Sequence, residues 1–127
     1  MSITNDTYIP AEYNTGIVRG DFFEESFVFS VDDSPLNLTG CDARIQIKDL
    51  SWARPAVSSL AEFTVTDDPS ANSGIFINEN TLTWVIGDND TKLFNPGTYV
   101  YDIEITIGNK VRTYVKGQFQ VERDVTI

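Results

Sequence analysis

The chain has 127 residues, of which 41% are apolar, including eight Phe, five Tyr and two Trp. This length and composition are typical of one globular domain with its own core and exclude a disordered chain. Nineteen Asp and Glu stand against nine Lys and Arg, and the resulting net charge of −10 disfavours contact with nucleic-acid phosphates and anionic membranes. We therefore expect neither nucleic acid nor a membrane among its partners.

Cysteine usage and the start of the chain bear on the cellular compartment. Cys41 is the one cysteine, so no intrachain disulfide can form, as is usual for a protein made in a reducing compartment. The stretch Met1–Asp6 has neither a basic region nor an apolar run, so we expect no signal peptide. No apolar run approaches the roughly 18 residues of a membrane span.

Residues 1–15 are expected to form an extended arm rather than an element of the fold. Pro10 cannot continue a helix and biases Ile9 toward an extended backbone. Tyr8, Ile9 and Tyr13 lie among Asn, Asp and Thr and give the arm apolar surface to bury. We expect this arm to dock onto a neighbouring molecule.

From Gly16 onward the pattern alternates as in half-buried strands. Cys41, Ala43, Ile45 and Ile47, for example, alternate with charged or polar residues. The predicted strands are residues 17–18, 22–31, 41–48, 60–65, 75–77, 81–86, 99–107 and 110–122. Gly108-Asn109 is expected to form a two-residue hairpin turn, and Gly117 to mark a bulge in the last strand. Residues 87–94 can hold one helical turn, and residues 49–58 are read as a long loop.

Seven to eight short strands separated by turns, with no convincing longer helix, predict an all-β fold. The expected architecture is a two-sheet antiparallel β-sandwich, immunoglobulin-like in the broad sense, over residues 16–127. A closed barrel is the alternative.

The residue types exclude several chemistries. The chain has no histidine, which rules out Ser-His-Asp and Cys-His catalysis and imidazole zinc sites. A two-carboxylate hydrolase needs one carboxyl whose pKa is raised by burial. The candidate carboxylates fall at outward or turn positions, namely Asp32, Asp33, Asp67, Asp68, Asp102 and Glu104. Glu25 has inward parity, and we expect it at a sheet edge or paired with a cation. No enzyme is therefore expected.

Calcium is the one cofactor that the acidic turns suggest. Asp88 and Asp90 alternate with Asn89 and present oxygen donors. The segment lacks the glycine and the distant Glu of an EF-hand loop, so a polar turn is the preferred interpretation over a calcium site.

Aromatic and basic residues predict where a partner binds. Trp52 in the irregular loop either contacts a partner, such as a carbohydrate or a protein, or covers the core. Tyr114 is predicted to point outward between Arg112 and Lys116, so these three residues form a basic face on an acidic protein. With Tyr8, Ile9 and Tyr13 of the arm, they complete the expected partner-binding set.

The order of turns and strands resembles a known group of domains. It runs from Gly20-Asp21-x-Phe23 through Pro35-x-x-Leu38-Thr39-Gly40 and Ala43–Lys48 to Gly74-x-x-Ile77, Pro96-Gly97-x-Tyr99 and Gly117-x-Phe119-x-Val121. Over residues 16–126 this resembles the small immunoglobulin-like β-sandwich domains of tailed-bacteriophage structural proteins, among them the amino-terminal domains of some baseplate and receptor-binding-associated proteins. The resemblance implies a protein made in the host cytoplasm and located in the virion.

We therefore expect a non-enzymatic virion protein that docks onto a phage tail, baseplate or head assembly through its arm and one sandwich face. Its expected partners are other virion proteins and further copies of itself. The alternative is a carbohydrate-binding module that uses loop aromatics such as Trp52.

Overall fold

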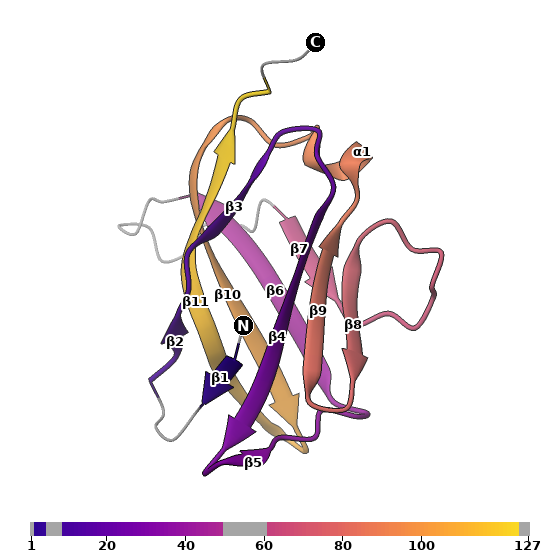
Figure 1. Cartoon of the computed structure of the whole chain (residues 1–127), viewed down its shortest axis with the longest axis vertical. Helices are drawn as coiled ribbons and strands as arrows, with labels where there is room; N and C mark the ends of the chain where they lie inside the picture. Colours follow the sequence, from indigo (N-terminus) through magenta and orange to yellow (C-terminus); the bar gives the residue numbers. More distant parts are fainter. Residues whose placement is uncertain (1, 5–8, 50–60, 125–127) are drawn as a thin grey trace.

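A computed structural model describes residues 2–4, 9–49 and 61–124 of the chain. These residues form two β-sheets that enclose one apolar core, with a single helical turn at one end (Figure 1). No helix in this part of the chain is long and apolar enough to cross a membrane. The expected all-β sandwich is confirmed.

Sheet A has the order β1-β4-β9-β8, with β5 also paired to β4. Its strands are β1 (Ser2–Thr4), β4 (Phe23–Val31), β5 (Ser34–Pro35), β8 (Gly74–Asn78) and β9 (Thr81–Ile86). β4, β9 and β8 pair antiparallel, whereas β1 runs parallel to β4.

Sheet B has the order β2-β11-β10-β6-β7, with β3 also paired to β11. Its strands are β2 (Ala11–Glu12), β3 (Thr15–Val18), β6 (Asp42–Asp49), β7 (Ala61–Thr64), β10 (Gly97–Ile107) and β11 (Lys110–Glu122). The helical turn α1 (Asp88–Thr91) follows β9, within the segment expected to hold one.

Two features differ from the expected antiparallel sandwich of seven to eight strands. The described residues contain eleven strands, and both sheets are mixed. The cause is the first part of the chain, since β1 joins sheet A in parallel while β2 and β3 join sheet B in parallel. Each joins a strand whose direction is already set by its antiparallel neighbour.

The described residues of the expected arm lie in the sheets instead of outside them. Ile3 in β1 pairs with Phe29 and is only 1% exposed. Ala11–Glu12 forms β2, and the backbone N–H of Tyr13 donates to the carbonyl of Lys116 at 2.9 Å. The expectation of an arm was wrong for these residues. A strand of two or three residues is too short to show alternation, so its single buried side chain cannot be recognised from the sequence.

A bulge in β11 lies at Tyr114 rather than at Gly117. Ile103 pairs with Val115 but the next residue, Glu104, pairs with Thr113, so Tyr114 is the extra residue. Such a bulge reverses the inward-outward alternation beyond it.

Gly117 has a different role from the one predicted. It is in register with Tyr101, and a Cβ at this position would lie 2.0 Å from the carbonyl oxygen of Tyr13. The glycine therefore allows the segment after β2 to pass close beneath β11.

Trp84 occupies the centre of the core. Its ring lies 4.9–5.7 Å, between centroids, from four aromatic rings: Phe23, Phe63, Tyr101 and Phe119. Because Trp84 belongs to sheet A while Tyr101 and Phe119 belong to sheet B, this cluster holds the sheets together. Trp84 and Tyr99 are both buried, at 0% and 7% exposure.

Candidate interaction surface

The predicted partner-binding residues do not gather on one surface. Tyr8 and Trp52 lie outside the described residues. Ile9 is 73% exposed, whereas Tyr13 is half-buried between the sheets. The carbohydrate interpretation depended on Trp52, so the described part of the chain adds nothing to it.

The basic face expected at Arg112, Tyr114 and Lys116 does not exist. Tyr114 is 5% exposed and packs edge-on against Phe29, with ring centroids 5.8 Å apart. The guanidinium carbon of Arg112 lies 5.1 Å from the Tyr114 ring centroid, while Lys116 is exposed on the outer face of sheet B. The bulge at Tyr114 breaks the alternation that the prediction assumed, so Tyr114 is buried beside Arg112 while Lys116 stays exposed.

Glu25 points inward as predicted, but its closest hydrogen-bond donor is a tyrosine rather than a cation. Tyr13 donates a 2.6 Å hydrogen bond to Oε1 of Glu25, and Tyr101 donates one of 2.5 Å to the carbonyl oxygen of Tyr13. This bond to Glu25, together with burial, raises the pKa of Tyr13. Burial, with smaller contributions from Tyr13 and Glu25, raises the pKa of Tyr101 far above its ordinary value. The three residues join β4, the segment after β2, and β10.

The acidic turn at α1 is occupied by internal contacts. The Ser73 hydroxyl donates to Oδ2 of Asp90 and accepts from the backbone N–H of Gly87 at 2.9 Å. Asp88 is exposed. Within residues 2–4, 9–49 and 61–124, no group of three or more Asp, Glu, Cys or His side chains converges on a point where a metal ion could bind.

The remaining carboxylates that we considered for hydrolysis lie on surfaces. Asp102 and Glu104 are on the outer face of sheet B, and Arg44 contacts Glu104 at 2.9 Å and Glu62 at 3.5 Å. Burial, followed by repulsion from Glu104, raises the pKa of Asp102, and attraction to Lys48 and Arg44 offsets part of this effect. Asp68 is fully exposed, and hydrogen bonds from Ser70 lower its pKa.

The outer face of sheet A is almost without charge. Residues that pair across neighbouring strands lie side by side on this face, so Ser26, Thr83 and Phe76 form one row. The face is formed by Ser2, Thr4, Glu24, Ser26, Val28, Ser30, Gly74, Phe76, Asn78, Thr81, Thr83 and Val85. Among these residues only Glu24 is ionisable, and neighbouring hydroxyls bond each other, as Ser26 and Thr83 do at 3.0 Å. We call this surface the neutral face.

The outer face of sheet B, in contrast, is rich in charged side chains. β6 alone places Asp42, Arg44 and Lys48 outward, and β10 adds Asp102 and Glu104. Two sheets of one small domain thus present outer faces of very different charge density.

A groove of about 500 Å³ opens beside the edge strands β7 and β8. Buried Phe63, Ile86 and Tyr99 contribute its apolar lining, and Glu62 and Asp90 contribute carboxylates. No described residue that lines it is basic, so the groove is unsuited to an anionic ligand.

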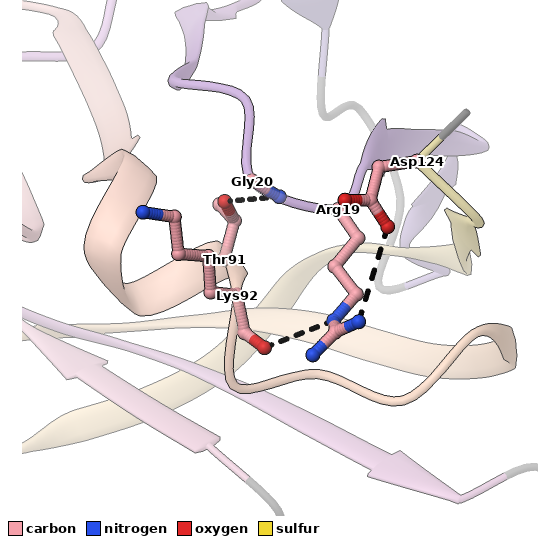
Figure 2. Close-up of polar contacts among 5 residues, drawn as sticks. All are labelled: Arg19, Gly20, Thr91, Lys92 and Asp124. Carbon is pink, nitrogen blue, oxygen red and sulfur yellow. Dashed lines mark hydrogen bonds and ion pairs between the residues drawn. The ribbon is translucent and has the colours of Figure 1, made fainter. Parts of the chain in front are cut away.

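The end of the sandwich near α1 is held by polar contacts between three segments (Figure 2). Arg19 donates through Nε to the carbonyl of Lys92 at 3.0 Å, and its Nη1 lies 3.9 Å from Oδ1 of Asp124. Thr91 is fully buried, and its hydroxyl accepts from the N–H of Gly20 at 3.0 Å and donates to the carbonyl of Asp21 at 2.9 Å. These contacts connect the β3–β4 turn, α1 and the residues after β11.

Sequence reasoning missed both the neutral face and Thr91. The outward parity of Ser26, Thr81 and Thr83 is visible in the sequence, but the adjacency of their strands is not. Thr91 gave no signal, because a threonine in a polar helical turn is usually exposed.

A search of solved structures finds the N-terminal domain of phage TP901-1 ORF48. The match has a TM-score of 0.50 and 18% sequence identity, and it covers 95% of this chain and 96% of that one. The chain shares the fold of this phage domain. No protein-family model matches the sequence, and a search of curated proteins finds no match. At this level of identity the likeness establishes the fold alone.

Proposed function

We propose that the chain is a non-enzymatic structural component of a phage virion, which docks onto a tail, baseplate or head assembly through one face of its sandwich. The observation that carries the proposal is the shared fold with the N-terminal domain of a phage protein over nearly the whole chain. The motif order noted in the sequence points to the same group of proteins.

The described surface also supports a binding role rather than a catalytic one. Among the carboxylates on it, Glu62 and Glu104 contact Arg44, Asp90 accepts from Ser73, and Asp68 accepts from Ser70. Glu25, which points inward, joins the two sheets through Tyr13. A small domain whose described residues present one almost uncharged face is suited to packing against another protein.

The structure changes which part of the chain we propose as the docking element. Ile3 and Tyr13 are held by the sheets, so residues 2–4 and 11–13 serve the fold. Within the predicted arm, the side chain of Ile9 is 73% exposed.

The proposal is tested by quantitative mass spectrometry of particles purified from a host that produces the phage. We expect a fixed copy number per particle that does not change after density-gradient purification. The value of this copy number distinguishes attachment to the head from attachment to the tail. A host-derived cytoplasmic protein of similar abundance serves as the carry-over control. If the chain is no more enriched in particles than this control, the proposed function is wrong.

A further inference from the structure

We infer that the neutral face of sheet A is the docking surface, and that it binds a protein surface that is uncharged at its centre and basic at its border. This inference rests on the proposed function and specifies the face and the partner chemistry.

Charged side chains are scarce on the neutral face. In a chain with 28 charged residues, 9 basic and 19 acidic, the strands β1, β4, β8 and β9 direct one ionisable side chain, Glu24, toward the outside of sheet A. The centres of protein interfaces are depleted of charged residues, because burying an unpaired charge costs free energy. The outer face of sheet B, with Asp42, Arg44 and Glu104, would carry that cost.

The neutral face also carries apolar side chains. Val28 is 37% exposed, and Phe76 and Val85 are half-buried on the same side of the sheet. Neighbouring hydroxyls already bond each other, as Ser26 bonds Thr83 at 3.0 Å and Thr4 bonds Ser30 at 3.3 Å. A partner that covers these pairs leaves few polar groups without hydrogen bonds.

The turns at the border of the neutral face are acidic. The turns that bound these strands carry the acidic residues Asp21, Asp32, Asp33, Glu79 and Asp88. Two basic residues lie near these turns. Arg19 donates to the backbone carbonyl of Lys92 and contacts the Asp124 carboxylate, and the side chain of Lys92 is exposed. A second copy of the chain would bring two acidic borders together, whereas a basic border on another protein is complementary to it.

The size of the neutral face makes the border necessary. Four strands about 4.8 Å apart, which average about six residues of 3.3 Å rise, cover on the order of 400 Å². A stable interface needs about 800 Å² on each partner. The contact therefore has to extend onto the acidic turns, and we expect it to weaken with added salt.

The test is competitive incorporation into particles. Wild-type chain and a variant are produced together in equal amounts, and their ratio in purified particles is measured by mass spectrometry. Val28→Lys and Thr83→Lys place a charge in the neutral face, and the matched control Gln46→Lys places it on the outer face of sheet B, where Gln46 is half-buried like Thr83.

We expect Val28→Lys and Thr83→Lys to fall at least tenfold below the wild type in particles, while Gln46→Lys stays equal to it. Urea unfolding of each purified variant separates lost docking from lost folding. Because Val28 is exposed, a substitution there should disturb folding less than one at Thr83. Equal incorporation of all three variants overturns the inference while leaving the proposed function intact. Absence of the wild type from particles overturns both.

The border is tested by the double variant Asp32→Asn and Asp33→Asn. Both residues have positive φ, 50° and 63°, which Asn tolerates well. We expect its incorporation to fall several-fold, and its release from particles to depend less on salt than that of the wild type. Unchanged incorporation and unchanged salt dependence would contradict a basic partner.

Discussion

The hydroxyl of Tyr13 donates a 2.6 Å hydrogen bond to Oε1 of Glu25 and thereby joins the segment after β2 to the inner face of sheet A. The same residue accepts a 2.5 Å hydrogen bond from Tyr101 of sheet B through its carbonyl oxygen. Its ring packs edge-on against Phe27, with centroids 5.7 Å apart. Tyr13 is therefore a connection between the two sheets and not part of a free arm.

Loss of the Tyr13 hydroxyl should destabilise the fold. Tyr13→Phe is expected to lower the free energy of unfolding by about 1–3 kcal/mol, because the half-buried Glu25 carboxylate loses its closest donor. Urea denaturation at neutral pH measures the change. In a double-mutant cycle with Glu25→Ala, the two losses should overlap by at least about 0.5 kcal/mol. Strictly additive losses would show that the hydrogen bond contributes nothing.

Stability should decline at alkaline pH. The pKa values of Tyr13, Tyr99 and Tyr101 are raised in the folded chain above the ordinary value of 10.0, so the folded state holds these protons more tightly than the unfolded chain. The stabilisation is complete below pH 10 and is lost as the pH rises through the folded-state pKa values. Urea midpoints between pH 8 and 11.5 measure this decline, and Tyr101→Phe should make it shallower. If stability declined equally steeply in that variant, titration of groups other than Tyr101 would be the cause of the decline.

Asp102→Asn should stabilise the protein at neutral pH. The pKa of Asp102 is raised mainly by burial, so its ionisation disfavours the folded state as the pH rises above 3.8. We expect a gain of less than about 1 kcal/mol, since the site is partly open to solvent. Thermal unfolding at pH 7 and pH 3 checks the sign, because the gain should vanish at the lower pH. A variant less stable than the wild type at pH 7 would contradict it.

Tyr114→Ala should be among the most destabilising single changes in β11. Tyr114 is buried against Phe29, and removal of a buried aromatic ring costs about 3–5 kcal/mol. Val111→Ala, in the same strand but 57% exposed, is the matched control and should change stability by no more than about 0.5 kcal/mol. Denaturant unfolding compares the two. If both variants lost similarly little stability, Tyr114 would have to point outward, as simple alternation predicts.

Alternation within single strands predicted a large part of the fold. Ala43, Ile45 and Ile47 in β6 and Phe27 and Phe29 in β4 are buried as their parity indicates. The hairpin at Gly108-Asn109 and the helical turn at α1 are also where turn chemistry places them. Glu25 points inward for the same reason, although its hydrogen-bond partner was not foreseen.

Short segments and register lay beyond the reach of the sequence. β1 has three residues and β2 has two, so neither shows a period, and they become strands only because β4 and β11 offer free edges. A one-residue bulge at Tyr114 reversed the orientation of Arg112 and removed the expected basic face. Bulges depend on how a strand meets its neighbour and leave little mark in its own composition.

The sequence by itself determined that the chain is acidic, lacks histidine and alternates as β-strands, because these properties belong to single residues and their near neighbours. The tertiary structure alone decided that Ser26, Thr83 and Phe76 share one row, since strands far apart in the chain become neighbours only through sheet pairing. It also decided that Tyr13 lies between the sheets and that Tyr114 is buried. The proposed docking surface is a property of that pairing.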